Sequence, residues 1–100
     1  MERGGYVYIM SNHIRSVFYI GVTSQLSTRI DQHKNGQGSV FTSKYNCTDL
    51  IYYEGFQFIE EAIKREKQMK KCKRDWKLTL IQKTNPQLLD LSDDVYKNRL

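Results

Sequence analysis

The chain has 100 residues, of which 39% are hydrophobic and 27% are charged, so it suits one domain (residues 1–100) and is not a disordered chain. Its formal net charge of +5 favours an anionic partner such as nucleic acid, although a modest positive charge can also serve solubility alone. No apolar run approaches the roughly 20 residues that span a bilayer, and the first residues lack the apolar core of a signal peptide, so no membrane association is expected.

The two cysteines, Cys47 and Cys72, do not form a closely spaced ligand pair. Without a secretion signal they are expected to be free thiols in a reducing compartment, which predicts a cytoplasmic protein. The two histidines, His13 and His33, lie at irregular spacing from the cysteines, and this pattern does not indicate a structural zinc site.

Two strands are predicted at the start of the chain. Residues 6–10 and residues 17–22 are rich in β-branched and aromatic side chains, and the polar residues 11–16 between them read as a turn. Because the connection is short, the two strands are expected to form an antiparallel hairpin.

A helix is predicted next, capped by Thr23 or Ser24 and running to about Asn35. Gly36 stands where a helix C-terminal glycine belongs, and residues 36–39 are the clearest loop of the chain. One side of this helix is expected to carry Leu26, Ile30 and His33, with Arg29 at its border.

The rest of the chain predicts one strand and two helices. Residues 50–54 read as a third strand, residues 58–72 and 75–82 as helices, and residues 85–91 as a loop or short helical turn. This order, β-β-α-β-α-α, predicts an α/β fold with a small three-stranded antiparallel sheet flanked by helices.

Glu66 is the first candidate for chemistry. It falls on the apolar stripe of its helix, which is expected to carry Ile59, Ala62, Ile63 and Met69. A lone carboxylate facing a core is costly unless it is paired or binds a metal ion. The alternatives are that Glu66 pairs with an arginine, accepts tyrosine hydroxyls, or lies at the edge of the stripe.

Tyr8 and Tyr19 are the second candidates, because an antiparallel hairpin can place them on the same face of the sheet. Two phenols there can be ordinary core packing, or they can orient and deprotonate a water molecule. Arg29 and His33, four residues apart on the first helix, are neighbours on its surface and suit phosphate binding. They can equally be a solvated face.

Eight of the 16 basic residues lie between Lys64 and Lys77, and they include Lys70 and Lys71. Such a cluster is typical of a surface that follows a nucleic-acid backbone. The alternative is the solvated outer face of an amphipathic helix.

Two short motifs, Tyr6-Val7-Tyr8 and Tyr19-Ile20-Gly21, lie in the two predicted strands. Further characteristic segments are residues 18–23, 26–33, 39–45, 50–54, 62–66 and 80–86. Together, from about Gly5 to Leu91, these segments resemble the GIY-YIG nuclease domain, in particular its small stand-alone bacterial members. The second motif of that domain matches literally, whereas in the first the leading glycine is absent unless Gly5 replaces it.

The resemblance implies an endonuclease that hydrolyses phosphodiester bonds, in DNA more than RNA, with one Mg²⁺ or Mn²⁺ ion as cofactor. The implied catalytic residues are Tyr8, Tyr19, Arg29, His33 and Glu66, with Glu66 also the metal ligand. The predicted nucleic-acid-binding residues are Gly21, Lys34, Lys44, Lys70, Lys71 and Asn85. DNA repair is the pathway that the resemblance suggests, and the oligomeric state stays open. The alternatives are a non-catalytic nucleic-acid-binding module and a basic protein-interaction domain.

Overall fold

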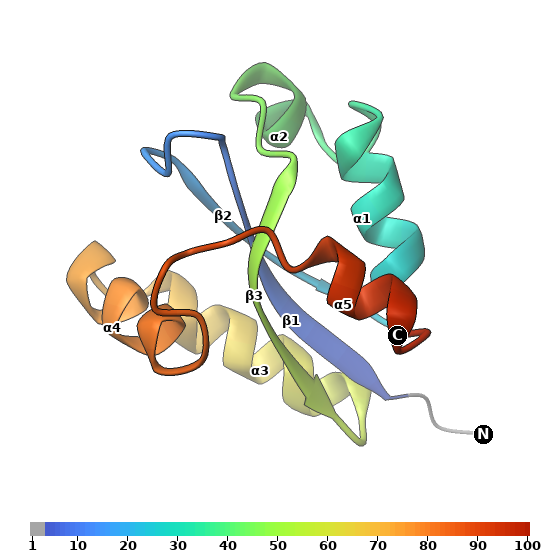
Figure 1. Cartoon of the computed structure of the whole chain (residues 1–100). Helices are drawn as coiled ribbons and strands as arrows, with labels where there is room; N and C mark the ends of the chain where they lie inside the picture. Colours follow the sequence, from blue (N-terminus) through green and yellow to red (C-terminus); the bar gives the residue numbers. More distant parts are fainter. Residues whose placement is uncertain (1–3) are drawn as a thin grey trace.

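The computed structural model describes residues 4–100, which form a three-stranded antiparallel sheet with helices on both faces (Figure 1). In chain order the elements are β1 (Gly5–Ser11), β2 (Phe18–Thr23), α1 (Leu26–Lys34), α2 (Val40–Lys44), β3 (Asp49–Phe56), α3 (Ile59–Lys70), α4 (Arg74–Thr84) and α5 (Ser92–Lys97). The predicted α/β fold is confirmed, and the short helices α2 and α5 are added to the predicted order.

The first strand, β1, lies in the middle of the sheet, which has the order β2-β1-β3. The predicted antiparallel hairpin of β1 and β2 is confirmed, with Tyr8 opposite Gly21 and Met10 opposite Tyr19. Because side chains alternate between the two faces of a strand, Tyr8 and Tyr19 lie on the same face of the sheet.

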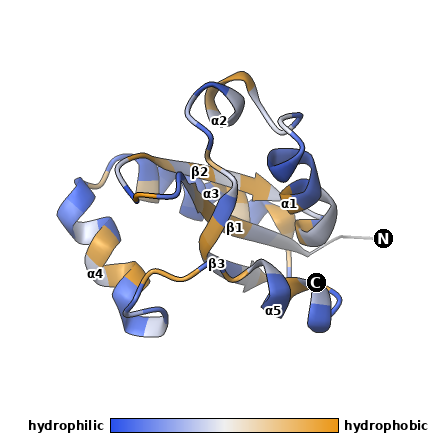
Figure 2. Cartoon of the chain, turned by 45° about the horizontal axis from the view of Figure 1, so that its top comes forward, coloured by the Kyte–Doolittle hydropathy of each residue, from blue (hydrophilic) through white to orange (hydrophobic). Residues whose placement is uncertain are grey.

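Each face of the sheet is covered by its own apolar core. Figure 2 shows hydrophobic residues concentrated on the strands and hydrophilic residues along much of the helices. On one face, α3 and α4 bury Val7, Ile9, Ile20, Ile51, Tyr52, Ala62, Met69 and Ile81. On the other face, α1 and α5 help to bury Tyr8, Met10, Leu26, Ile30, Cys47, Leu50 and Val95.

Helix α1 starts later than predicted, and the expected capping residues are wrong. Its N-cap is Gln25, which makes no side-chain capping bond. The hydroxyl of Thr23 instead accepts the Gln25 backbone N–H at 3.0 Å, in the turn that directly precedes the helix. The prediction for Gly36 is confirmed, because its φ of 75° lies in the left-handed region that favours glycine.

Helix α2 was not expected from the sequence, because five residues are too few to show a helical period. Its start does carry a local signal. The Ser39 side chain is the N-cap and accepts the backbone N–H of Thr42 at 3.1 Å. Thr42 is the buried residue of this helix, and its neighbours Val40, Phe41, Ser43 and Lys44 are exposed.

Helix α5 braces α1 from the C-terminal end of the chain. Val95 is fully buried in the same core as Leu26 and Ile30. The hydroxyl of Tyr96 donates a hydrogen bond to the Asp31 carboxylate. Just before α5, the Asp90 carboxylate pairs with the ammonium of Lys34 on α1 at 3.0 Å.

Asn85 closes part of the outer edge of β3. Its amide donates to the backbone carbonyls of Ile51 at 3.0 Å and Leu89 at 2.8 Å, and its carbonyl accepts the Leu89 N–H at 3.0 Å. The residue is only 4% exposed, and β3 is the strand at the opposite edge from β2. This geometry supports a structural role, so we leave Asn85 out of the proposed nucleic-acid surface.

Both cysteines are free thiols; Cys47 is buried and Cys72 is partly exposed. None of the helices within residues 4–100 combines the length and the apolar character needed to cross a membrane.

Replacing Asn85 by alanine should lower the free energy of unfolding by about 3 kcal/mol, because it leaves the buried carbonyl of Ile51 and the partly buried backbone groups of Leu89 without their partner. Urea unfolding followed by circular dichroism measures this loss. The matched control is Asn98→Ala, since Asn98 is exposed and donates only to the Asp94 carbonyl of its own helix. Equal stability of the two variants would contradict the structural role of Asn85.

Candidate active site

The hydroxyl of Tyr8 lies directly over Gly21. A Cβ atom added to Gly21 would stand 2.3 Å from the Tyr8 hydroxyl oxygen, so no side chain fits there without moving the phenol. Tyr8 is on the central strand and Gly21 on the edge strand β2. The missing side chain therefore lets a tyrosine of the central strand extend its hydroxyl across the edge strand.

A chain of hydrogen bonds runs from Tyr8 into α2. The Tyr8 hydroxyl lies 2.9 Å from Nε2 of His33, and Nδ1 of His33 lies 2.9 Å from the hydroxyl of Thr42. The Thr42 hydroxyl is in turn 2.9 Å from the Ser39 hydroxyl and 3.3 Å from the Ser39 carbonyl. Both His33 and Thr42 are 1% exposed, so this chain is shielded from water.

The network assigns the tautomer of His33. Every contact is satisfied when Nδ1–H donates to the Thr42 hydroxyl, which itself donates to the Ser39 carbonyl and accepts the Ser39 hydroxyl. Nε2 then carries a lone pair and accepts the Tyr8 hydroxyl. In the opposite tautomer, the Ser39 carbonyl loses its contact with Thr42. We therefore assign Nδ1 as the protonated nitrogen.

Both members of the Tyr8–His33 pair are uncharged near neutral pH. Burial raises the pKa of Tyr8 to about 12; the guanidinium of Arg29 opposes this rise, while Tyr19 and Glu66 add to it. Burial and the charge of Arg29 lower the pKa of His33 to about 4. Burial of the phenol therefore outweighs the effect of the positive charge of Arg29 on the pKa of Tyr8.

Tyr19 and Arg29 lie beside this pair. The ring centroid of Tyr19 is 6.5 Å from that of Tyr8 and 5.6 Å from that of His33. One guanidinium nitrogen of Arg29 donates to the Gln32 side chain at 3.0 Å. The guanidinium is close enough to affect the pKa of both Tyr8 and His33, and it has further N–H donors for a phosphate.

Glu66 lies at the edge of the buried stripe of α3. Ala62 and Met69 are buried on that helix, whereas Ile63 is exposed and the Glu66 side chain is 17% exposed. Its carboxylate lies 3.5 Å from the ammonium of Lys70, one turn later. The charge of the carboxylate also contributes to the raised pKa of Tyr8.

The chemistry of Glu66 fits a hard divalent cation. Residues 4–100 contain no cluster of three or more His, Cys, Asp or Glu side chains that could enclose a metal ion. A cation at Glu66 would therefore have at most two such side chains of the described residues and complete its shell with water and phosphate oxygens. Mg²⁺ commonly binds proteins in this way.

The predicted lysines have different surroundings. The ammonium of Lys34 is held by Asp90 and by the Thr48 carbonyl, so it fastens α1 to neighbouring segments. Lys44 lies 5.3 Å from the ring centre of Tyr45. Lys70 pairs with Glu66, and Lys71 is the exposed C-cap of α3.

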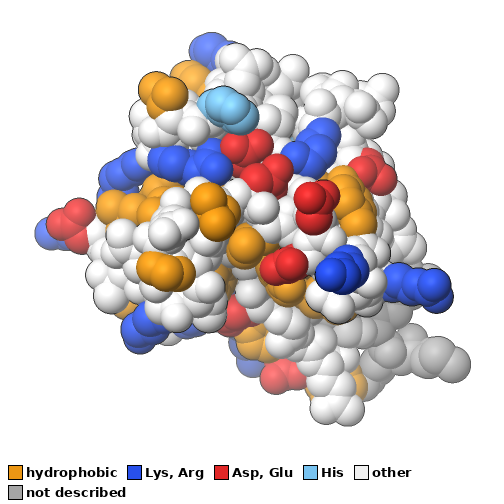
Figure 3. Space-filling model, viewed as in Figure 1, with side chains coloured by type: hydrophobic (Ala, Val, Ile, Leu, Met, Phe, Trp, Pro, Cys, Tyr) orange, Lys and Arg blue, Asp and Glu red, His pale blue; other side chains and the backbone are white. Residues whose placement is uncertain are grey.

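The basic cluster of residues 64–77 has structural and exposed members. Arg65 donates to the Glu54 carboxylate, and Arg74 lies 4.0 Å from the ring centre of Phe18. Lys64, Lys67, Lys71 and Lys73 are exposed, and Lys70 is exposed but paired with Glu66. The face of the molecule shown in Figure 3 carries acidic and basic side chains side by side, so it is not a uniformly basic surface.

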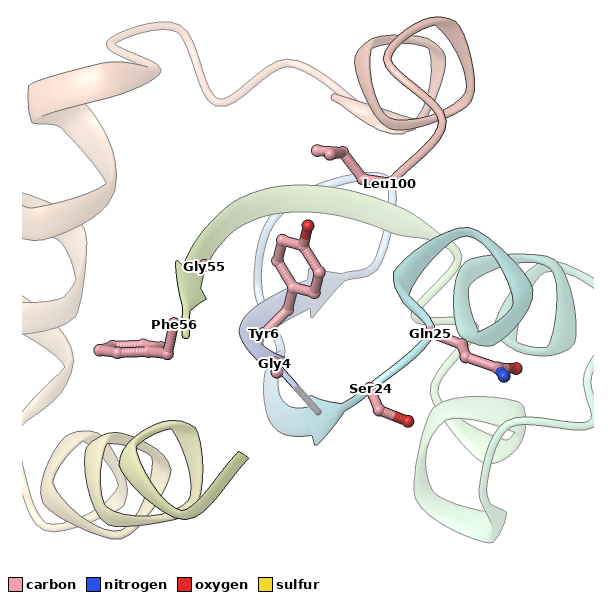
Figure 4. A pocket seen from close by; sticks show the side chains of 8 residues that line it. Gly4, Tyr6, Ser24, Gln25, Gly55, Phe56 and Leu100 are labelled. Atoms are coloured by element: carbon pink, nitrogen blue, oxygen red, sulfur yellow. The ribbon is translucent and has the colours of Figure 1, made fainter. Parts of the chain in front are cut away.

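A separate shallow hollow of about 570 Å³ lies near the start of β1 (Figure 4). Its lining includes Tyr6, Ser24, Gln25 and Phe56, and no charged side chain is among the lining residues of the described chain. This hollow therefore offers no charged side chain to a phosphate or a metal ion.

Sequence reasoning missed the parts of the site contributed by residues 38–42. Gly38 packs so closely on His33 that an added Cβ would lie 1.9 Å from Nδ1. Thr42 supplies the hydrogen bond that orients the ring. The available signal was the Ser39 N-cap followed three residues later by Thr42, but it does not indicate a contact with His33.

Comparisons with known proteins agree with this arrangement. A family model described as the GIY-YIG catalytic domain matches residues 4–85. A UPF0213 protein of Clostridium perfringens is 41% identical over 76 residues, which is 76% of this chain and 81% of that protein. A UPF0213 protein of Staphylococcus saprophyticus is 38% identical over 76 residues, covering 76% of this chain and 92% of that protein. The names of these relatives state no activity.

A solved structure has the same fold. The solution NMR structure of a UPF0213 protein from Bacillus halodurans has a TM-score of 0.53 and 29% sequence identity. The match covers 82% of this chain and 86% of that chain. It extends the likeness from sequence motifs to the arrangement of the sheet and helices.

His33 should make the stability of the protein depend on pH. Its pKa is about 4 in the folded chain and 6.5 when unperturbed, so the unfolded chain binds the proton more readily. The contribution is fully present above pH 6.5 and falls as pH drops toward 4. We expect a loss of about 2 kcal/mol between about pH 7 and about pH 5.

Urea unfolding at both pH values measures this loss, and the control is His33→Gln, whose side chain does not titrate. The variant should lack the His33 contribution to the pH dependence, whatever its absolute stability. An identical pH dependence in the two proteins would show that His33 is not held in its neutral form by the fold.

Proposed function

Because this chain belongs to the GIY-YIG catalytic domain family, we propose that it is a metal-dependent endonuclease that hydrolyses phosphodiester bonds in nucleic acid, in DNA more than RNA. The observation that carries the proposal is the convergence at Gly21. Tyr8 and His33 are hydrogen-bonded there, Tyr19 lies beside both, and Arg29 and Glu66 act electrostatically on Tyr8.

Activation of the attacking water involves two residues rather than a preformed phenolate. The Tyr8 oxygen accepts a proton from the water while the Tyr8 hydroxyl passes its own proton to Nε2 of His33. Because His33 is neutral near pH 7, it has a free lone pair for that proton. The buried phenol thus transfers a proton without an isolated negative charge, which its raised pKa disfavours.

The rest of the site would act on the phosphate. Water oxygen forms a bond to phosphorus, one ester P–O bond breaks, and the leaving oxygen takes a proton from solvent. The planar guanidinium of Arg29 stabilises the negative charge that develops on the phosphate, as its unused N–H donors suit two phosphate oxygens. An incoming phosphate also favours protonation of His33, since a negative charge nearby raises its pKa.

Glu66 is the residue that would hold the divalent cation, Mg²⁺ or Mn²⁺. Such an ion supplies Lewis-acid stabilisation of charge on the phosphate. Among the described ion pairs, the ammonium of Lys70 is the positive charge that lies beside the Glu66 carboxylate, at 3.5 Å. The Lys70 ammonium therefore has to move away from the Glu66 carboxylate when a cation binds there. Its position beside the site suits contact with a neighbouring phosphate of the nucleic acid.

Glu66→Gln should lower metal-dependent cleavage on the order of a thousandfold, because the glutamine keeps the shape but loses the charge that binds the cation. Cleavage is measured with Mg²⁺ or Mn²⁺ on single-stranded, duplex and branched DNA and on RNA. The control is Glu61→Gln, an exposed residue of the same helix, which should retain wild-type activity. Activity of Glu66→Gln equal to the control would remove Glu66 from its role.

The same assay tests the alternatives. Binding of any of these nucleic acids without cleavage by the wild-type protein would favour a non-catalytic binding module. Absence of both binding and cleavage would favour a basic protein-interaction domain. Either result would contradict the proposed nuclease activity.

Thr42→Val should lower kcat by about a hundredfold, because His33 loses the partner that fixes its proton on Nδ1. Thr42→Ser keeps the hydroxyl and should restore most of the activity. The nitrogen NMR shifts of His33 report the tautomer directly, and they should change in the valine variant but not in the serine variant. Unchanged shifts with Thr42→Val would contradict the positioning role.

A further inference from the structure

Three aromatic side chains form a continuous row that begins in the candidate site. The ring of Tyr19 stacks on that of Phe41, with centroids 5.8 Å apart and an angle of 29° between the planes. The ring of Phe41 is 4.8 Å from that of Tyr45 at an angle of 48°. We call Tyr19, Phe41 and Tyr45 the aromatic row.

The outer members of the aromatic row are not core residues. Phe41 and Tyr45 are each 41% exposed, and Val40 beside them is 87% exposed. Helix α2 stands at the top of the molecule in Figure 1, and hydrophobic colour marks this segment in Figure 2. A group of exposed aromatic rings on a short helix indicates a binding surface more than a contribution to stability.

The aromatic row is continuous with the phosphate side of the site and carries a positive charge at its other end. Tyr19 lies beside both Tyr8 and His33, so a strand with its phosphate at Tyr8 passes the first ring. The ammonium of Lys44 lies 5.3 Å from the ring centre of Tyr45 at the last ring. Aromatic rings interleaved with cations are the arrangement that binds unpaired nucleobases and their phosphates.

We propose that the aromatic row binds unpaired bases next to the phosphate that is cut, so that the substrate is single-stranded nucleic acid. This inference rests on the proposed nuclease function and names its substrate class. In a duplex the faces of the bases are covered by their neighbours, so exposed rings gain little from paired DNA. In a single strand every base has a free face that stacks on Phe41 or Tyr45.

Binding measured without divalent metal separates this inference from catalysis. The wild-type protein is titrated in EDTA with three fluorescent probes of equal length: an oligodeoxythymidylate, a strand in which every base is replaced by an abasic site, and a duplex. We expect the oligodeoxythymidylate to bind at least about tenfold more tightly than either other probe, because only it offers free base faces.

Two variants test the rings themselves. Phe41→Leu and Tyr45→Leu keep apolar volume but remove the flat ring, so each should weaken binding of oligodeoxythymidylate by about five- to tenfold. Binding of the abasic strand should stay within about twofold, because its phosphates still contact the same cations. Val40→Ala is the control on the same helix and should bind all three probes like the wild type.

Equal affinity of the wild-type protein for the base-containing and abasic strands, or tighter binding of the duplex, overturns the proposal without requiring any variant to fold. So does an equal loss for both strands in the leucine variants, which would mean that the rings only support α2. These outcomes leave the nuclease proposal intact, since cleavage of a duplex is measured separately. Conversely, a wild-type protein that binds the base-containing strand more tightly but cleaves no nucleic acid would contradict the nuclease proposal and leave the binding of unpaired bases intact.

Discussion

The two hydrogen bonds of the His33 imidazole, to Tyr8 and to Thr42, hold together three separate parts of the fold. Tyr8 comes from the central strand, His33 from the first helix, and Thr42, on the other side of the imidazole, from a helix of only five residues. These bonds form only because two glycines leave room, Gly21 beneath the phenol and Gly38 against the imidazole. These close approaches fix the ring positions more strictly than a single hydrogen bond does.

The two edges of the sheet have different uses. At the β3 edge, backbone groups of Leu50 and Ile51 are bonded to the segment around Asn85 and Asp90, so that edge is partly closed. At the β2 edge, the Tyr8 hydroxyl lies over Gly21, and α3, which carries Glu66, packs against β2 and β1. The candidate site thus draws on residues from both faces of the sheet, joined across one edge strand.

The elements with a clear period were predictable, and the site was predictable only in part. The hairpin, the third strand and the three longer helices follow from alternating or helical apolar patterns, which burial on two faces of a sheet imposes. Residue type and position indicate Tyr8, Tyr19, Arg29 and Glu66 as candidates, whereas their catalytic roles are what the family resemblance implies. The helical pattern alone leaves a core-facing and an edge position open for Glu66, and in the structure it lies at the edge of the stripe.

What could not be predicted depends on contacts between distant segments. Nothing in the sequence near Thr42 reveals that its hydroxyl meets His33, nine residues earlier. The burial of Tyr8 that raises its pKa is a property of the assembled core. The role of Asn85 likewise depends on backbone groups of a strand 34 residues away. Local propensity carries none of this information.

Helix α5 extends the folding unit beyond the segment that matches the family model. The family-matched segment stops at residue 85, yet Val95 fills the core under α1, and Asp90 and Tyr96 hold α1 through Lys34 and Asp31. Helix α1 carries both Arg29 and His33. A fragment trimmed to the family boundary would leave apolar surface of α1 open to water and release its side-chain tethers. The shortest fragment that folds alone and keeps the His33 imidazole in place is therefore longer than the family-matched segment, residues 4–85.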